Sequence, residues 1–228
     1  WRLHGNGGGN SGGNYSRDGN LAKWKRDKAE LIAYIPQQPT YRISEQDTIH
    51  SFDYLEEQTH TTLRVHQETE NPRYLSVLYP RRLISCCENS NPETPSFKTV
   101  EASGGTAIMI DLKDKKDITW LRNSNEKFFN ISNSSEKLES DAALGYTRQS
   151  NKLLSDFSIQ DGSNLIFNHV AFLQSNFPVD AGISLEDTSY AGFIRGPESG
   201  YTVKIPLQNR LIKQAVFAGN PIEAVIEN

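Results

Sequence analysis

The chain contains five histidines, His4, His50, His60, His66 and His169. A zinc site needs three or four converging ligands, often with a spacing such as H-x-x-x-H. His60 and His66 are six residues apart, and on a strand an even separation puts both on one face but about 20 Å apart. The histidines therefore predict no metal site, and we expect them to be surface or hydrogen-bonded residues.

The other reactive side chains form no recognisable catalytic set. The sequence supports no nucleophile triad, because Ser85 has no assignable His or Asp partner. Glu56 and Glu57 are adjacent, so on a strand they face opposite ways and make poor partners for acid–base chemistry. Cys86 and Cys87 are also adjacent, a spacing that rarely forms a disulfide, and we expect two reduced or buried thiols. The sequence predicts no catalytic residue and no cofactor.

Carbohydrate binding is the one local chemistry that the residues favour. Aromatic rings stack on sugar faces, and Asn, Arg and His side chains hydrogen-bond hydroxyl and carboxylate groups. The chain has three tryptophans and nine tyrosines, although aromatic residues in β-proteins often belong to the core. The segment from Trp1 to Asn6 runs directly into a glycine-rich stretch. The candidate substrate-binding residues are His4, Asn6 and Trp24.

Residues 5–20 read GNGGGNSGGNYSRDGN. A phosphate-binding Walker loop would need a Gly-Lys-Ser/Thr end, and a dinucleotide loop would need a helix after it. Neither is found here. Because glycine carries a high backbone entropy, we expect a long mobile loop over 5–20.

Size and composition limit the classes of function. A chain of 228 residues suits one large all-β domain or two small ones. Net charge is −4, from 24 basic and 28 acidic residues, which predicts no basic stripe and no nucleic-acid partner. No apolar run approaches the ~20 residues of a membrane span, so we expect no membrane partner. The chain opens at Trp1 rather than at Met, and we expect a fragment of a larger protein.

Alternating and β-branched segments recur along the chain, and no helical period is sustained. Ala29–Ile35, His60–Val65 and Tyr74–Tyr79 are predicted strands, the last one bracketed by Pro72 and Pro80. Further predicted strands follow every 8–14 or so residues. An Asp161-Gly162 pair predicts a hairpin turn. We therefore predict an all-β fold: a single antiparallel β-sandwich of two stacked sheets spanning 1–228.

Four segments resemble the heparinase II/III-like polysaccharide lyases. The opening Trp1–Gly8 (WRLHGNGG) is similar to a strand in the later β-rich region of that family. Thr59–Leu63 (THTTL), Tyr74–Pro80 (YLSVLYP) and Thr106–Asp111 (TAIMID) resemble strands that follow it. The resemblance covers roughly the first half of the chain.

The resemblance implies a lyase that cleaves uronate-containing polysaccharides, such as alginate or glycosaminoglycans, by β-elimination. Such an enzyme neutralises the uronate carboxylate, removes the C5 proton with a base and protonates the leaving O4. The family's catalytic and metal-binding residues lie upstream of the segment at Trp1–Gly8, so none is carried onto this chain. The chain alone is therefore expected to be inactive.

The resemblance further implies two partners, an acidic polysaccharide and a missing N-terminal helical catalytic domain, and a periplasmic or secreted location. In this reading the chain supports the catalytic domain and shapes one wall of its substrate cleft. Two alternatives stay open. One is a stand-alone carbohydrate-binding module, and the other is a structural sandwich without a ligand.

Overall fold

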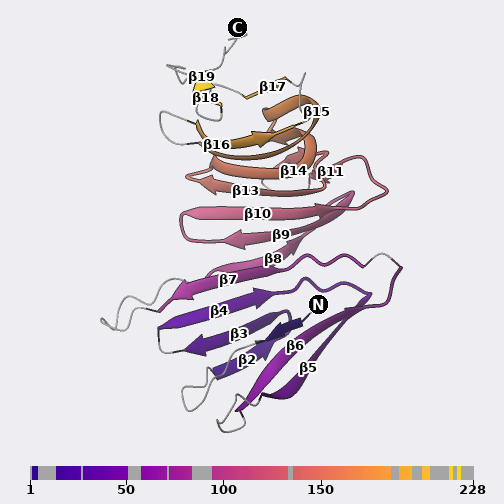
Figure 1. Ribbon diagram of the computed structural model, residues 1–228, viewed down its shortest axis with the longest axis vertical. Helices are drawn as coiled ribbons and strands as arrows, with labels where there is room; N and C mark the ends of the chain where they lie inside the picture. The colour runs from indigo at the N-terminus through magenta and orange to yellow at the C-terminus, as the bar shows by residue number, and fades with distance from the viewer. Residues whose placement is uncertain are drawn as a thin grey trace. The chain divides into compact units, whose positions relative to one another are not determined.

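The computed structural model describes residues 2–4, 14–26, 28–50, 58–70, 72–83, 94–132, 136–185, 190–196, 202–205, 216–217 and 220–221. Every regular element in these ranges is a β-strand, and no helix occurs in them (Figure 1). All the strand pairings described below are antiparallel. The all-β prediction is therefore confirmed.

The chain divides into two compact units. The first consists of Trp1–Thr99 with Ile110–Lys113, and the second of Val100–Met109 with Asp114–Asn228. The proposal that 1–228 is a single domain of a larger lyase stays a prediction.

The first unit holds two small sheets. One has the strand order β1-β6-β5, with β1 at Arg2–His4, β5 at Tyr41–His50 and β6 at Gln58–Gln67. The other has the order β2-β3-β4-β7, with β2 at Asn14–Asp18, β3 at Leu21–Arg26, β4 at Ala29–Tyr34 and β7 at Val77–Arg82.

Both of these sheets contribute to one hydrophobic cluster. Strand β6 supplies Leu63 and Val65, whereas Ala22 and Ala33 come from β3 and β4. Leu63 and Val65 are two residues apart, and alternate residues of a strand point to the same face. The odd-numbered residues of β6 therefore face this core, and its even-numbered residues face the other way.

The largest sheet has ten strands. Its main path runs β11-β12-β14-β13-β10-β9-β8, and β15 pairs with β14, β16 and β17. The bounds are β8 Ser96–Val100, β9 Gly105–Asp111, β10 Lys115–Arg122, β11 Phe129–Ile131, β12 Leu138–Ser140, β13 Leu144–Ser150, β14 Leu153–Phe167, β15 Val170–Leu185, β16 Tyr190–Arg195 and β17 Val203–Lys204. A separate two-stranded sheet joins β18 (Val216–Phe217) to β19 (Asn220–Pro221).

The core of the second unit is built around Trp120. Its ring is fully buried and stacks on Phe129, with 5.6 Å between the ring centroids and 11° between the planes. Gly145 lies opposite Trp120 in the register of β10 and β13. A Cβ atom at Gly145 would lie 1.9 Å from Trp120 Cζ2, so only glycine leaves room for the indole. Trp120 is thus a core residue, as aromatic residues of β-proteins often are.

The prediction of a loop over 5–20 is wrong for the C-terminal part of that segment. Asn14–Asp18 form strand β2, which pairs with β3 along its whole length. Tyr15 explains the difference, because its ring packs against Trp24 at a centroid distance of 5.2 Å and contributes to the hydrophobic cluster. Residues 5–13 lie outside the described ranges.

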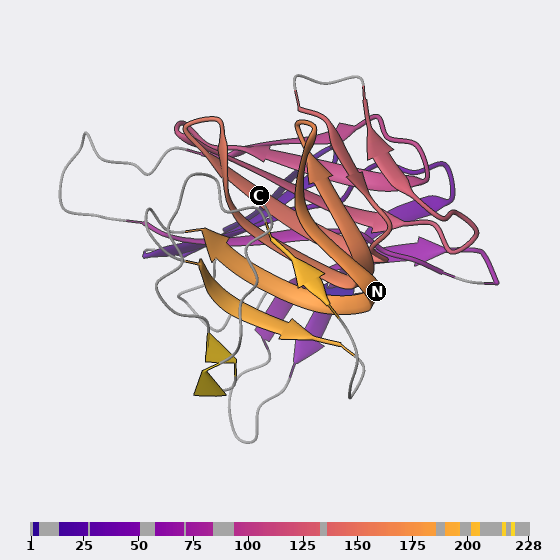
Figure 2. The ribbon, with the colours of Figure 1, turned by 90° about the horizontal axis from the view of Figure 1, so that it is seen from above.

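The predicted hairpin at Asp161-Gly162 is also wrong. Strand β14 continues through both residues, and its register with β15 shifts around Gly162. Asp161 has a φ of 51°, so the positive φ that the dipeptide favours occurs in a β-bulge. The β14–β15 hairpin turns instead at Asn168-His169, with φ values of 47° and 68°. The bulged strand β15, drawn in orange, bends along its length (Figure 1, Figure 2).

Pro80 does not end a strand as predicted but lies inside β7, opposite Leu31 of β4. Strand β7 is the last strand of its four-stranded sheet. Proline lacks an N–H donor and is tolerated on such an edge. The predicted strand Tyr74–Tyr79 accordingly begins later, at Val77.

Candidate functional site

The predicted substrate-binding residues fall in the first unit or outside the described ranges. Trp24 lies in β3, pairs with Tyr15 and Leu31, and packs partly buried against the hydrophobic cluster. Its Nε1 atom is buried and has no hydrogen-bond partner within the described residues. Trp24 is therefore engaged with the core on at least one side, which leaves less of its ring for a sugar. Its assignment to substrate binding stays a prediction.

His4 is the last residue of β1 and lies opposite Thr62 of β6 in the register. Asn6 lies outside the described residues. The assignment of His4 and Asn6 to substrate binding therefore stays a prediction. The register does put His4 of β1 on the same side of the sheet as the even-numbered residues of β6, several of which are basic.

The register of β1, β6 and β5 gathers these basic residues on one face. From β1, Arg2 is opposite Arg64 and His4 is opposite Thr62 of β6. From β5, the residues opposite the even-numbered positions of β6 are Arg42 (at His66), Ser44 (at Arg64), Gln46 (at Thr62), Thr48 (at His60) and His50 (at Gln58). These twelve positions lie on the side of the sheet that carries the even-numbered residues of β6, which is the side opposite to Leu63 and Val65. We call them the arginine–histidine face.

The arginine–histidine face holds three arginine and four histidine positions, and none of its twelve positions is acidic. Four of the chain's five histidines belong to it. The fifth, His169, is exposed at the β14–β15 turn. Glu68 follows the last residue of β6, and its carboxylate lies 3.4 Å from the Arg42 guanidinium. Both side chains of that pair are largely exposed.

Arg64 lies on the central strand of this sheet. Its Nε atom is buried and has no hydrogen-bond partner among the described residues. Around it, Ser44, Gln46 and His66 are exposed, whereas Thr62 is fully buried. A guanidinium presents five N–H donors in a planar fork that matches a carboxylate or a sulfate. The face can therefore offer both charge and hydrogen bonds to an anion.

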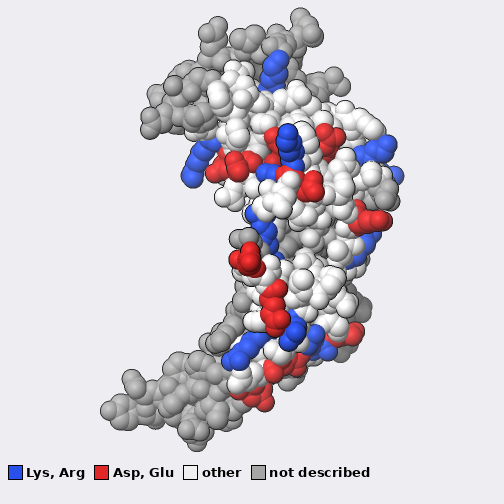
Figure 3. All heavy atoms as spheres, turned by 90° about the vertical axis from the view of Figure 1, so that its right-hand side faces the viewer, with Lys and Arg blue, Asp and Glu red and all other residues white. Residues whose placement is uncertain are grey.

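Sequence reasoning missed this face because a net charge of −4 predicts no basic stripe. The signal is nevertheless present in the alternation of His60, Thr62, Arg64 and His66 with the residues between them. Arg2, His4 and Arg42 join the face only through pairing with strands that are distant in the sequence. On the face drawn in Figure 3, Lys and Arg intermingle with Asp and Glu over the described residues, without a large area of one sign.

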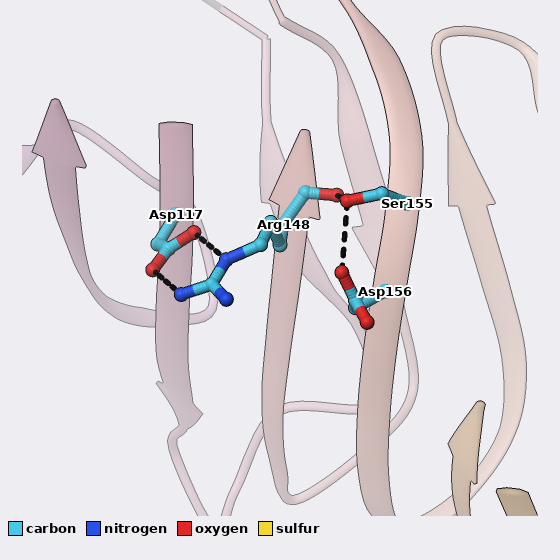
Figure 4. A network of polar contacts seen from close by, with 4 residues as sticks. All are labelled: Asp117, Arg148, Ser155 and Asp156. Carbon is cyan, nitrogen blue, oxygen red and sulfur yellow. Dashed lines mark hydrogen bonds and ion pairs between the residues drawn. The ribbon is translucent and has the colours of Figure 1, made fainter. Parts of the chain in front are cut away.

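The second unit contains a different polar network, on strands β10, β13 and β14 (Figure 4). Arg148 donates from Nε to Asp117 Oδ1 at 2.8 Å and from Nη2 to Asp117 Oδ2 at 2.7 Å. The Ser155 hydroxyl lies 2.8 Å from Asp156 Oδ2 and 3.2 Å from the Arg148 carbonyl oxygen. It has one proton and donates to one of them at a time, with preference for the charged carboxylate.

Tyr146 completes this network. The Arg148 guanidinium carbon lies 5.8 Å from the centroid of the Tyr146 ring. Burial, followed by the neighbouring Asp117 carboxylate, raises the pKa of Tyr146 above its ordinary value. A general base for elimination needs a pKa near the working pH, so Tyr146 is poorly suited to remove a C5 proton. The network fits a structural clamp between neighbouring strands better than a catalytic centre.

No group of three His, Cys, Asp or Glu side chains in the described ranges could hold a metal ion. Within those same ranges there is also no helix long and apolar enough to cross a membrane. Comparison with protein-family models and with curated proteins found nothing that matches this chain.

Proposed function

We propose that this chain is the C-terminal β-sandwich region of a polysaccharide lyase that cleaves uronate-containing polymers by β-elimination. In this proposal a separate helical domain carries the catalytic residues. The present chain supports that domain and forms one wall of its cleft, in a protein that works in the periplasm or outside the cell.

The observation that carries the proposal is the pairing of two segments that resemble the heparinase II/III-like family. The segment at Trp1–Gly8 contains β1, and the segment at Thr59–Leu63 lies in β6. These strands pair directly, with Leu3 opposite Leu63. The other two similar segments, at Tyr74–Pro80 and Thr106–Asp111, overlap β7 and β9. Consistent strand placement of all four segments supports a common architecture.

The sandwich part of the proposal is supported by the hydrophobic cluster of the first unit. Leu63 and Val65 of one sheet share that cluster with Ala22 and Ala33 of the other. Two antiparallel sheets that bury their apolar faces against a common core are the arrangement of a β-sandwich.

The test is an elimination assay on two proteins, the chain alone and the chain produced together with the coding sequence that precedes Trp1. Both are incubated with alginate and with heparan sulfate, and the absorbance of unsaturated uronate is followed. We expect product from the longer protein only. Product from the chain alone would contradict the supporting role. Absence of product from the longer protein on every uronate polymer would contradict the lyase assignment.

A further inference from the structure

We propose that the arginine–histidine face is a binding site for the carboxylate or sulfate groups of an acidic polysaccharide, with Arg64 as its central contact. The choice of polymer rests on the proposed function. The anion site itself rests on the register and on the surroundings of Arg64.

The first argument is the arrangement of charge. In the backbone register Arg2 of β1 is opposite Arg64 of β6. Arg42 lies opposite His66, one row away from Arg64. Strands are spaced about 4.8 Å apart, and residues of one face recur about every 6.8 Å along a strand. Arg42 and Arg64 therefore lie within reach of one extended anion, whose charge would offset their repulsion.

The second argument is the environment of Arg64. Its buried Nε has no acceptor in the described part of the chain. A buried donor without an acceptor costs more free energy than a hydrogen bond contributes. In the register, Arg64 is flanked by Arg2 and Ser44, neither of which carries an acid. Arg64 as a whole is only partly buried, and an oxygen of a carboxylate or sulfate that binds its guanidinium would supply an acceptor.

The third argument concerns the chemistry beside the charges. Ser44 and Gln46 are exposed on the same face, and their hydroxyl and amide groups can both donate and accept. They suit the hydroxyl groups of a sugar chain. The twelve positions include no Phe, Tyr or Trp, although proteins that bind single-stranded nucleic acid stack bases on aromatic rings. Because sugars also stack on aromatic rings, the face would hold an anionic polymer through charge and hydrogen bonds alone, and the choice of a polysaccharide rests on the proposed function.

Arg42 is able to exchange its partner. Its pair with Glu68 is highly exposed, with side chains 76% and 64% accessible. Exposed pairs of this kind contribute little to stability. A carboxylate or sulfate of the ligand can therefore replace Glu68 at small cost, and Arg42 extends the site along β5.

The test measures binding of the purified chain to heparan sulfate and alginate at low salt, with dextran as the neutral polymer. Arg64→Gln is expected to weaken binding to the acidic polymers about tenfold, because a charge-assisted bidentate contact is lost. Arg42→Gln is expected to weaken it about two- to threefold, since that side chain is exposed. Dextran should not bind. The matched control is Arg195→Gln, which removes one positive charge from β16 in the second unit and should leave binding unchanged.

Arg64→Lys separates charge from geometry. Lysine keeps the charge but not the planar fork, so we expect affinity between that of Arg64→Gln and that of the unchanged protein. Thermal melting shows whether Arg64→Gln is folded. If it is not, the contribution of Arg64 to binding is measured with Arg64→Lys alone. Equal weakening by Arg64→Gln and Arg195→Gln would overturn the site, as would no binding at low salt. Tighter, Arg64-dependent binding of single-stranded DNA would overturn the choice of polysaccharide.

The elimination assay and this binding assay test two different proposals, and a negative result in one does not decide the other. Arg64-dependent binding without elimination by the longer protein would retain the face and reject the lyase. Elimination by the longer protein, together with polymer binding that ignores Arg64, would retain the lyase and reject the face.

Discussion

The Asp117 carboxylate receives two hydrogen bonds from the Arg148 guanidinium, at 2.8 and 2.7 Å. Asp117 is 3% exposed, whereas the Arg148 side chain is 35% exposed. The two residues are directly opposite each other on β10 and β13. The pair therefore joins a buried acid to a partner that water reaches, and the consequences of removing either residue differ.

Arg148→Ala is expected to lower the free energy of unfolding. Removing one partner of a buried ion pair costs about 3–5 kcal/mol, because the other charge is left uncompensated. We expect about 2–3 kcal/mol here, since Arg148 is partly exposed and water already screens the pair. Urea denaturation of the variant and of the unchanged chain measures the difference.

The control for this variant is Lys98→Ala. Lys98 lies 3.6 Å from Asp111, and its side chain is 60% exposed, so its loss should cost less than about 1 kcal/mol. Similar costs for Lys98→Ala and Arg148→Ala would contradict a special role for the Asp117–Arg148 pair.

Gly145→Ala is expected to destabilise the second unit strongly. The added Cβ would lie 1.9 Å from Trp120 Cζ2, and the indole is held by its stacking on Phe129. Overpacking of a core costs typically about 1–3 kcal/mol and occasionally more. We expect the upper part of that range, measured by urea denaturation with Trp fluorescence as the signal.

Gly19→Ala is the comparison for Gly145→Ala. A Cβ added at Gly19 would meet no described atom within 4 Å, but the residue has a φ of 53°. Its substitution is therefore strained by the backbone alone, at about 1–2 kcal/mol. A smaller cost at Gly145 than at Gly19 would show that Trp120 can move aside.

Strand positions could be predicted from the sequence where one face is buried. The strands at Ala29–Tyr34 and Gln58–Gln67 overlap the predicted strands Ala29–Ile35 and His60–Val65. The hairpin predicted at Asp161-Gly162 is wrong because a residue with left-handed φ suits a hairpin turn and a β-bulge equally well. The choice between them depends on pairing with β15, which the local sequence does not encode.

The candidate site was harder to predict than the strands. His60 and His66 could be assigned to one face from their even spacing alone. Arg2 and His4 join that face through pairing with residues about 60 positions away, as in Arg2 with Arg64. The site is therefore a product of strand register, and composition hides it because acidic residues outnumber the basic ones over the whole chain.

His169→Gly is expected to stabilise the β14–β15 hairpin by about 0.5–1 kcal/mol. Both turn residues have positive φ, with His169 at 68°, and two-residue turns of this kind prefer glycine. The relief of the left-handed strain exceeds the entropy that glycine loses on folding. Thermal melting of the variant measures the gain.

Asn168→Gly tests the same turn with a different outcome. Asn168 also has a positive φ, of 47°, but its Oδ1 accepts a hydrogen bond from the Lys137 backbone N–H at 2.9 Å. Loss of that bond offsets the conformational gain, so we expect no stabilisation. A gain equal to that of His169→Gly would mean that the Asn168–Lys137 bond contributes nothing.

Tyr15 and Tyr146 are expected to keep their protons well above pH 10. Burial, the largest cause, raises the pKa of both, and each phenol also lies beside a carboxylate, Glu45 for Tyr15 and Asp117 for Tyr146. An unfolded tyrosine loses its proton near pH 10. Above that pH the folded state binds more protons than the unfolded state, so the free energy of unfolding falls as pH rises. Below pH 10 the contribution is fully present.

Ultraviolet absorbance of tyrosinate during an alkaline titration measures this effect. The folded chain should show a late-titrating component, and Tyr15→Phe and Tyr146→Phe should each remove part of it. The chain in guanidinium chloride is the reference, where every tyrosine should titrate near pH 10. A folded chain whose tyrosines all titrate together near pH 10 would mean that water reaches both phenols, and it would remove the argument against Tyr146 as a base.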